Sequence, residues 1–289
     1  MPRSLKLALL LFAPVAIFGA MIATDRVLGS PGRGYAYVQR IELARAETLI
    51  GLPSISGPQD ASRPLVVIDP GHGGHDPGAS GGDVVEKALT LRLAKRLRDE
   101  LLASGGIRVA LTRDDDRYLL LTERSDIARR LGADLFLSIH ADSVESNADA
   151  RGASVYTLSE RGSSDTAARI AARENRSDTV NGVSLASTSN SVSAILVDLS
   201  QRETQAHSDD FARLILREAR GQMRMHDDEV QSAAFVVLKS PDMPSALFES
   251  GYISNPEDAA LLSSEKGQGA FARSLASAIR VYFARQTRP

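Results

Sequence analysis

Short apolar runs alternate with amphipathic helical patterns along most of this chain, and this alternation limits the possible folds more than any other feature. The run at 65–68 is continuous and rich in β-branched residues, as expected of a strand buried on both faces. Strands that alternate with helices indicate an α/β domain with a twisted, mostly parallel sheet flanked by helices. Further strands are predicted at 107–111, 133–139, 153–158, 234–238 and 246–248.

Three amphipathic patterns predict the flanking helices. A leucine stripe at four-residue spacing predicts a helix over 89–101, which Gly105 and Gly106 end. Thr122 is the predicted N-terminal cap of a second helix. Residues 271–283 form a closing amphipathic pattern. Each helix can therefore bury one apolar stripe against the sheet.

Residues 160–231 interrupt the alternation, and we interpret them as a helical insertion. The stretch is rich in Ser, Asp, Arg, Ala and Asn, with a polar helical pattern at 167–175. A sharper apolar stripe follows at positions i, i+3, i+4 and i+7 of a helix. The members of this stripe are Val192, Ile195, Leu196 and Leu199.

The N-terminal part of the chain differs from the rest. Arg3 and Lys6 precede an apolar run, so residues 1–23 are predicted to be a cleaved signal peptide or an uncleaved membrane anchor. Either form places the protein outside the cytoplasm, in the periplasm, with anchoring to the inner membrane only if the segment is retained. Residues 24–63, punctuated by Gly and Pro, are the expected tether, and 64–287 the folded domain.

Composition excludes several classes of function. With 34 basic and 36 acidic side chains the formal charge is −2, so the chain has no basic footprint for nucleic acid. The chain contains no cysteine, which excludes a disulfide scaffold, an iron–sulfur cluster and a thiolate metal site.

Chemistry-bearing side chains follow three of the predicted strands. His72, His140 and Glu249 each lie at or just beyond the end of an apolar run. Ligands of open α/β sheets bind beyond the carboxyl ends of the strands, so we expect these side chains at one edge. Glu86 lies just before the leucine-striped helix, from where it can turn to the same edge.

Two histidines and one carboxylate leave one position open on a tetrahedral zinc ion, as hydrolytic sites require. A second carboxylate can then take up and return a proton. A single His after a strand is more often structural, but the joint placement of four such groups favours a zinc hydrolase. His75 is an alternative to His72, whereas His207 and His226 lie in polar surroundings and are expected at the surface.

Six sequence blocks contain or adjoin these groups. They are Val67-Ile68-Asp69-Pro70-Gly71-His72-Gly73-Gly74, Asp76-Pro77-Gly78-Ala79, Glu86-Lys87, Leu111-Thr112-Arg113, Ser138-Ile139-His140-Ala141-Asp142 and Pro244-Ser245-Ala246-Leu247-Phe248-Glu249-Ser250-Gly251-Tyr252-Ile253-Ser254-Asn255-Pro256. In this order they resemble the zinc-dependent N-acetylmuramoyl-L-alanine amidases, over about residues 64–285.

The resemblance implies a peptidoglycan hydrolase that cuts the amide between the lactyl group of N-acetylmuramic acid and the first L-alanine of the stem peptide. It implies that His72, Glu86 and His140 bind zinc and that Glu249 is the catalytic carboxylate. The family fold, a twisted mixed sheet flanked by helices, agrees with the alternation of strands and helices.

The insertion resembles the regulated, cell-division branch of this family. Residues 173–178 are similar to its Glu-Asn-x-x-Asp element, and 194–201 to its inserted helix. On this resemblance Glu174 becomes a candidate fourth metal ligand that blocks the site. The apolar stripe of four residues defined above becomes a candidate surface for an activator protein. The alternative is that the stripe packs on the enzyme's own core.

Two other functions fit the same residues. A zinc peptidase or deacetylase that acts on another cell-wall bond would use the same metal site. A non-catalytic wall-binding module would be favoured by loss of Glu249 or of a zinc ligand, and none of these residues is lost.

Overall fold

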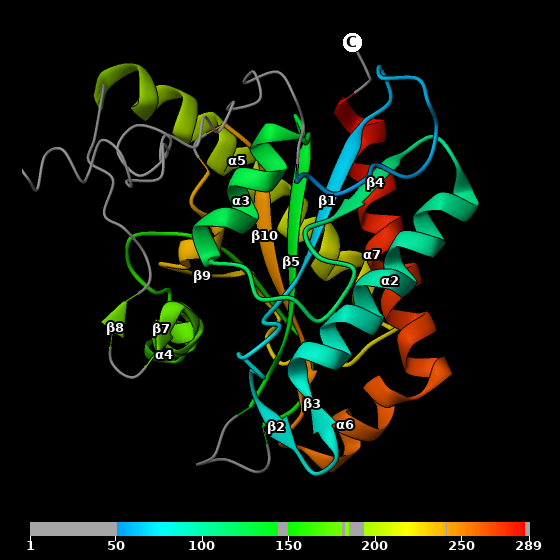
Figure 1. The fold of residues 1–289 in the computed structure, drawn as a ribbon, viewed down its shortest axis with the longest axis vertical. Helices are drawn as coiled ribbons and strands as arrows, with labels where there is room; N and C mark the ends of the chain where they lie inside the picture. Colours follow the sequence, from blue (N-terminus) through cyan, green and yellow to red (C-terminus); the bar gives the residue numbers. More distant parts are fainter. Residues whose placement is uncertain (1–50, 144–149, 181–182, 185–193, 241, 287–289) are drawn as a thin grey trace, which may run out of the picture. The chain divides into compact units, whose positions relative to one another are not determined.

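Six strands form one sheet in the order β4-β1-β5-β10-β6-β9 (Figure 1). The computed structural model describes residues 51–143, 150–180, 183–184, 194–240 and 242–286. The first four strands of the sheet are parallel, β6 runs antiparallel to β10, and β9 runs parallel to β6. The predicted twisted, mostly parallel sheet is therefore confirmed. The strands are β1 (Leu65–Pro70), β4 (Arg108–Leu111), β5 (Leu135–Asp142), β6 (Ser154–Leu158), β9 (Gln231–Ala233) and β10 (Ser245–Tyr252).

The central strands are buried throughout. Every residue of β1, β5 and β10 is buried, as the continuous apolar runs predict for strands covered on both faces. The register places Pro70 beside Ile139 and Glu249 beside His140. The carboxyl ends of β1, β5 and β10 therefore meet at one edge of the sheet, which we call the carboxyl edge.

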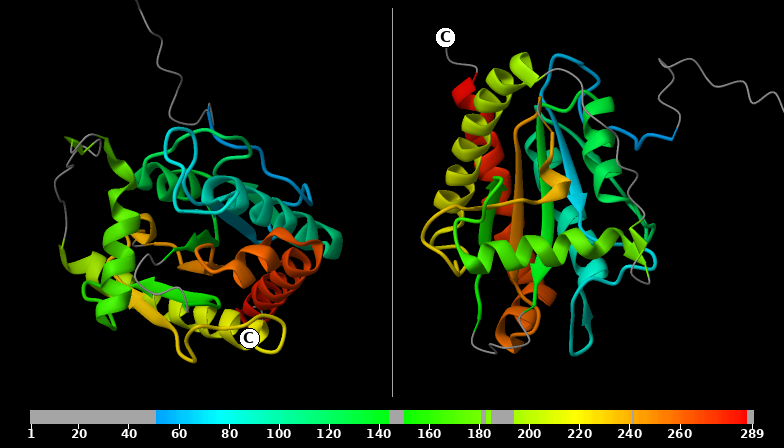
Figure 2. Two further views of the ribbon diagram at one scale, coloured as in Figure 1. Left: turned by 90° about the horizontal axis from the view of Figure 1, so that it is seen from below. Right: turned by 90° about the vertical axis from the view of Figure 1, so that its left-hand side faces the viewer.

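Helices cover both faces of the sheet (Figure 2). Side chains of α2, α5 and α7 pack with Val66 and Ile68 on one face, and α3, α4 and η2 pack with Val67 on the other. Because side chains alternate along β1, Val66 and Ile68 lie in one core and Val67 lies in the other. These helices are α2 (Glu86–Ser104), α3 (Leu121–Arg130), α4 (Asp165–Glu174), α5 (Ala194–Ala219), α7 (Glu265–Gln286) and the 3₁₀ helix η2 (Val236–Leu238).

Smaller elements complete the described chain. No helix within the described ranges is long and apolar enough to cross a membrane, and the predicted segment 1–23 lies outside them. The remaining elements are the strands β2 (Ser80–Gly81), β3 (Val84–Val85), β7 (Thr179–Val180) and β8 (Val183–Ser184), the 3₁₀ helix η1 (Asn175–Asp178) and the helix α6 (Pro256–Ser263).

The predicted strand at 234–238 is wrong. The strand in this region is β9, which ends at Ala233, and the apolar residues that follow form the 3₁₀ helix η2. Val237 and Leu238 are buried against the sheet face that also carries Val67. The apolar run is buried by packing below the sheet rather than by pairing within it, and composition alone does not separate these two outcomes.

The predicted cap of α3 is also wrong. The helix begins at Leu121, so Thr122 lies inside its first turn and Leu120 holds the cap position. Two carboxylates replace the expected hydroxyl: the Leu120 N–H donates to Glu123 Oε2 (2.8 Å), and the Leu121 N–H donates to Asp178 Oδ1 (3.0 Å). A residue of the predicted insertion thus caps a helix of the sheet domain.

The region interpreted as an insertion, 160–231, contains a long helix that belongs partly to the core. Phe211 and Ile215 in the second half of α5 have no exposed surface, and the Phe211 ring lies 5.4 Å from that of Tyr282 in α7. The second half of α5 is therefore a structural layer of the domain. α4 likewise buries Ala167, Ile170 and Ala171 in the core on the other face of the sheet, so residues 160–231 are not a simple insertion.

Part of the predicted tether also contacts the domain. Ser56 exchanges two backbone hydrogen bonds with Val109 on the edge strand β4, at 2.8 and 2.9 Å. Residues 51–63 therefore do not behave as a free linker, because they cover an edge of the sheet that would otherwise be open. Residues 24–50 of the predicted tether lie outside the described residues.

We predict that Phe211→Ala lowers the free energy of unfolding by about 3–5 kcal/mol, because it leaves a cavity between α5 and α7. Urea unfolding measures this loss. Leu261→Ala is the matched control, since Leu261 is 41% exposed and its truncation should cost about 0.5 kcal/mol or less. Equal losses in the two variants would contradict the placement of α5 in the core.

Candidate metal centre

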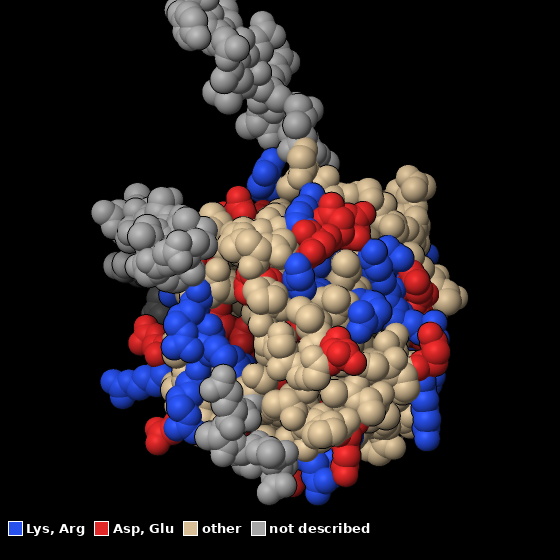
Figure 3. Space-filling model, turned by 60° about the horizontal axis from the view of Figure 1, so that its bottom comes forward, with Lys and Arg blue, Asp and Glu red and all other residues tan. Residues whose placement is uncertain are grey.

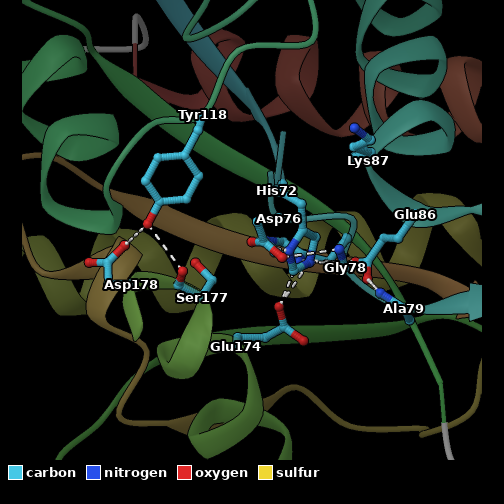
Figure 4. A network of polar contacts seen from close by, with 12 residues as sticks. His72, Asp76, Gly78, Ala79, Glu86, Lys87, Tyr118, Glu174, Ser177 and Asp178 are labelled. Carbon is cyan, nitrogen blue, oxygen red and sulfur yellow. Dashed lines mark hydrogen bonds and ion pairs between the residues drawn. The ribbon is translucent and has the colours of Figure 1, made fainter. Parts of the chain in front are cut away.

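Four buried side chains converge at the carboxyl edge, and Figure 4 labels three of them, His72, Glu86 and Glu174. His72 lies in the loop after β1, Glu86 is the first residue of α2, His140 lies in β5, and Glu174 is the last residue of α4. One donor atom from each lies within 4.8 Å of the others. The structure thus brings together three strand-end or helix-start residues and one residue of the insertion.

The donor atoms of this cluster alternate between nitrogen and oxygen. His72 Nε2 lies 3.1 Å from Glu86 Oε1 and 3.2 Å from Glu174 Oε2. His140 Nδ1 lies 3.2 Å from Glu86 Oε1 and 3.0 Å from Glu174 Oε2. Each imidazole therefore faces both carboxylates across a common centre.

The residues present fit a divalent metal ion. His72 Nε2 and Glu174 Oε2 are buried and have no hydrogen-bond partner, although charged groups surround them. Buried polar atoms rarely stay unpaired, so a cation shared at the centre of the cluster explains why these two atoms point into it. Two imidazoles with two carboxylates form a nitrogen and oxygen set that zinc accepts.

Outer contacts orient the ligand side chains. His72 Nδ1 lies 2.8 Å from Asp76 Oδ2 and carries the proton there, because a carboxylate only accepts. This leaves the lone pair on Nε2 facing the cluster, an arrangement typical of metal-binding histidines. The backbone N–H groups of Ala79 and Ala141 donate to the two oxygens of Glu86, at 2.8 and 2.9 Å.

Two glycines allow the ligand loops to approach each other. A Cβ atom at Gly71 would lie 2.5 Å from the His140 ring. A Cβ atom at Gly78 would lie 2.6 Å from both Glu86 Oε2 and the His72 ring, and Gly78 also has a φ of +67°. Any side chain at these positions would push a ligand away from the centre.

The charges of the cluster shift one another's pKa values. Burial opposes the charged form of His140, but Glu174 and Glu86 outweigh it and raise the pKa of the imidazole to about 10. Burial likewise opposes the charged form of Glu86, yet His72 and His140 lower the pKa of its carboxyl to about 2. Without a metal, the protein therefore holds protons on the imidazoles in place of the cation.

Glu249 lies beside the cluster without joining it. It is buried on β10 as the register partner of His140, so the two side chains point to the same side of the sheet. Both of its carboxylate oxygens are buried without a hydrogen-bond partner. Burial, together with the charges of Asp142 and Glu174, raises the pKa of Glu249 well above its usual range.

The end of α4 is fixed to the domain on both sides of Glu174. Arg173 pairs with Asp142 on β5 and, at 3.0 Å, with Glu174 Oε1. The Asn175 side chain donates to the carbonyl of Ala234 at 2.8 Å and accepts the N–H of Val236 at 2.9 Å.

Asp178 supplies another attachment of this segment. The Tyr118 hydroxyl donates to Asp178 Oδ1 at 2.9 Å and lies 3.1 Å from the carbonyl oxygen of Ser177 (Figure 4). Asp178 also caps α3 through the N–H of Leu121. Together with the contacts of Arg173 and Asn175, these bonds hold the α4–η1 segment over the cluster.

Other sequence-based candidates lie elsewhere. His75 is exposed, and its ring packs against that of Tyr118 with centroids 4.1 Å apart and an interplanar angle of 42°. His226 and His207 lie outside the cluster. Val192 lies outside the described residues. Ile195, Leu196 and Leu199 lie in α5, where the description of residues 194–201 is limited to the helical backbone.

Sequence reasoning missed two residues beside the site. Asp142 lies two residues beyond His140 on β5, so the period of two would have placed both on one face. No pattern in the sequence pointed to Arg173, which pairs with Asp142.

On the face of the molecule drawn in Figure 3, basic and acidic side chains are interspersed, as the formal charge of −2 suggests.

Comparisons with known proteins identify relatives of this chain. Residues 66–281 match the family model described as N-acetylmuramoyl-L-alanine amidase. The chain is 40% identical over 246 residues to N-acetylmuramoyl-L-alanine amidase AmiA of Salmonella typhimurium, covering 83% of this chain and 84% of that protein. It is 42% identical over 217 residues to AmiA of Escherichia coli, covering 74% of this chain and 73% of that protein.

Solved structures show the same fold. The N-acetylmuramoyl-L-alanine amidase AmiC2 of Nostoc punctiforme is 30% identical with a TM-score of 0.54, covering 77% of this chain and 98% of that chain. The catalytic domain of CwlV, an N-acetylmuramoyl-L-alanine amidase from Bacillus (Paenibacillus) polymyxa, is 26% identical with a TM-score of 0.57. That match covers 76% of this chain and 98% of the CwlV chain.

We predict that chelator-treated protein loses stability as the pH rises above neutrality. A His140 pKa raised from 6.5 to about 10 contributes stability that is fully present below pH 6.5 and is lost as the pH rises through 10. A Glu86 pKa lowered from 4.5 to about 2 contributes stability above pH 4.5 that is lost as the pH falls through 2.

Urea unfolding from about pH 5 to 10 measures this dependence. The loss of stability above pH 6.5 should be smaller in His140→Gln, which cannot hold the proton. Identical slopes in the parent protein and in His140→Gln would show that the imidazole does not carry the effect.

Proposed function

Because the chain belongs to the N-acetylmuramoyl-L-alanine amidase family and is a metal-dependent hydrolase, we propose that it uses zinc to cut the amide between N-acetylmuramic acid and L-alanine in peptidoglycan. His72, Glu86 and His140 hold the zinc ion, and Glu249 is the catalytic carboxylate. The buried convergence of two imidazoles and two carboxylates at the carboxyl edge is the observation that carries this proposal.

The residues around the cluster divide the chemistry between them. A bound zinc ion supplies Lewis acidity, which polarises an amide carbonyl and lowers the pKa of water. Asp76 keeps the proton on His72 Nδ1, so that Nε2 stays available as a ligand. The positive charge of a bound zinc ion would favour the ionised form of Glu249, which is buried and free of hydrogen bonds. Glu249 then takes a proton from the attacking water and returns it to the leaving amine of L-alanine.

The same site is self-inhibited in this proposal. Glu174 Oε2 faces both imidazoles at 3.0 and 3.2 Å, where it is a regulatory fourth ligand of the metal. A tetrahedral zinc ion with four protein ligands has no position left for water. While α4 stays in place, the enzyme is therefore closed to both nucleophile and substrate.

An activator protein opens the site by moving the α4–η1 segment. The contacts of Arg173, Asn175 and Asp178 with the sheet domain must break, and these bonds make the closed form the stable one. The apolar stripe of Val192, Ile195, Leu196 and Leu199 is the proposed binding surface, because it follows this segment in the chain.

The organisation of the chain supports an exported enzyme. Residues 1–23 act as a signal peptide or anchor, 24–63 include a tether, and 64–287 form the catalytic domain. The predicted signal or anchor favours the periplasm, and the likeness of residues 173–178 and 194–201 to the regulated branch of the family favours a role in cell division. Peptidoglycan is the substrate and the activator is the second partner.

We predict that digestion of purified cell-wall sacculi by the activated, zinc-loaded enzyme releases intact stem peptides that begin with L-alanine. Mass spectrometry of the soluble products identifies the bond that was cut, and chelation of the metal should abolish release. Shortened peptides would instead indicate a peptidase, loss of acetyl groups a deacetylase, and no release at all a binding module.

We predict that Glu249→Gln lowers wall hydrolysis by roughly 10²–10⁴-fold, since positioned proton transfer contributes about that much. Its zinc content, measured by elemental analysis, should equal that of the parent. Glu257→Gln, an exposed carboxylate on α6, is the control that should retain activity. Near-parental turnover in Glu249→Gln would assign the proton transfer to another group.

We predict that Glu174→Ala raises basal wall hydrolysis by roughly tenfold or more, because an interaction with a charged group contributes about 1.5–3 kcal/mol. Asp165→Ala, an exposed carboxylate on the same helix, should leave the basal rate unchanged. Tyr118→Phe, which only loosens Asp178, should give a smaller rise.

Glu174→Ala and Tyr118→Phe test self-inhibition by point substitution, whereas deletion of residues 163–220 would also remove the core residues Phe211 and Ile215 of α5. Self-inhibition by Glu174 is wrong if Glu174→Ala stays folded and zinc-loaded but hydrolyses sacculi no faster than the parent.

A further inference from the structure

His72 has an unusual backbone conformation. Among the described residues it is the one non-glycine residue with a φ in the left-handed region, at +60°. Side chains disfavour this region, so surrounding contacts must hold the residue there. The conformation matters because it sets the direction in which the imidazole leaves the loop.

Carbonyl groups of the same loop leave the sheet at this point. β1 ends at Pro70, and the carbonyls of Pro70, Gly71 and His72 accept hydrogen bonds from side chains rather than from a neighbouring strand. Buried carbonyl groups need donors, and here the donors come almost entirely from two buried arginines. These are Arg113, with no exposed surface, and Arg124, which is 1% exposed.

Arg113 binds the loop to the first turn of α2. Its Nε donates to the Pro70 carbonyl at 3.0 Å, and its Nη2 donates to the Gly71 carbonyl at 2.7 Å. The same Nη2 donates to the carbonyl of Lys87 at 2.9 Å. Since Lys87 follows Glu86, one guanidinium connects the segments that carry two of the four cluster residues.

Arg124 reaches the loop from α3. Its Nη2 donates to the carbonyl of His72 itself at 2.9 Å, and its Nη1 donates to the Pro70 carbonyl at 2.8 Å. Nη1 also pairs with Asp69 Oδ1 at 2.9 Å. Asp69 is fixed in turn by the hydroxyls of Thr112 and Ser138, at 2.6 and 2.8 Å.

We propose that Arg113 and Arg124 are positioning residues for the metal site, which hold His72 in its left-handed conformation and fix it relative to Glu86 before a metal binds. This inference rests on the proposed metal site and adds two residues that touch neither metal nor substrate. It explains why two guanidiniums are buried below the site with Asp69 as their one hydrogen-bonded carboxylate among the described residues.

The geometry explains why both positions hold arginine. Arg113 donates from Nε, Nη1 and Nη2 to carbonyls that lie in different directions, and Arg124 does the same. A guanidinium offers five donors in a rigid plane, whereas an ammonium offers three from a single point. A lysine would keep the positive charge but could not bond to all of these carbonyls at once. An arginine-to-lysine substitution therefore tests the effect of the donor geometry while the charge stays the same.

The test compares zinc affinity with folding stability. Zinc binding to chelator-treated full-length protein is measured by competition with a chromophoric chelator, and urea unfolding of the same samples gives their stability. Arg113→Lys and Arg124→Lys should each weaken zinc affinity by roughly 10–100-fold, as loss of partners that orient metal ligands typically does. The visible spectrum of the cobalt-substituted protein should change as well, because it reports coordination geometry.

Arg108→Lys is the matched control. Arg108 also donates to backbone carbonyls, those of Arg63 and Ala61, but it begins β4, whereas Arg113 follows the other end of this strand. The Arg108→Lys protein should keep the parental zinc affinity even if its stability falls. A purely structural role for Arg113 and Arg124 would give the same result as this control, and parental affinity in both folded lysine variants would overturn the proposal.

A milder variant keeps the test decisive if the lysine variants do not fold. The Thr90 hydroxyl donates to the Gly71 carbonyl at 2.9 Å and lies 3.3 Å from Arg113 Nη2. Thr90→Val removes this one link and should weaken zinc affinity several-fold, and unchanged affinity would contradict the proposal. A parent protein that binds no zinc would overturn the metal site itself, which is a different outcome.

Discussion

The need to hold a cation between two buried carboxylates and two imidazoles determines the rest of this structure. Glu86 and Glu174 are almost fully buried, and each faces His72 and His140 within about 3 Å. Carboxylates at such a place are costly unless positive charge compensates them. The parallel strands bring the imidazoles to one edge, and the first turn of α2 and the last turn of α4 bring the carboxylates. Below them, Arg113 and Arg124 keep the loop of His72 in the one conformation that reaches the centre.

The two carboxylates differ in how firmly the fold holds them. Glu86 begins a 19-residue helix that packs on the sheet and accepts two backbone N–H groups. Glu174 ends a ten-residue helix that packs three buried apolar side chains on the domain and is otherwise fixed by polar contacts of Arg173, Asn175 and Asp178. A ligand held by side-chain contacts can leave without unfolding the sheet, whereas Glu86 cannot. This difference supports a switch in which Glu174 leaves the metal site while Glu86 stays in place.

Much of the fold and of the cluster was predictable from the sequence, because continuous apolar runs specify buried parallel strands and such strands share a carboxyl edge. That reasoning placed His72, His140 and Glu249 at one edge of the sheet, as the structure has them, and it expected Glu86 just before the helix of which it is the first residue. It failed at 234–238, where an apolar run is buried below the sheet instead of within it. It also could not foresee the arginine contacts, because Arg113 and Arg124 meet the loop across 42 and 52 residues of sequence. Contacts of that range depend on tertiary packing and leave no local pattern.

The most direct test of this account is the anomalous scattering of crystals of the full chain, recorded on both sides of the zinc absorption edge. We expect one anomalous peak at about 2.0–2.2 Å from a donor atom of each of His72, Glu86, His140 and Glu174. A peak with these four contacts would establish both the metal centre and its closed state in a single measurement. A zinc peak elsewhere, or one in this cluster with the Glu174 carboxylate turned away from it, would contradict the account.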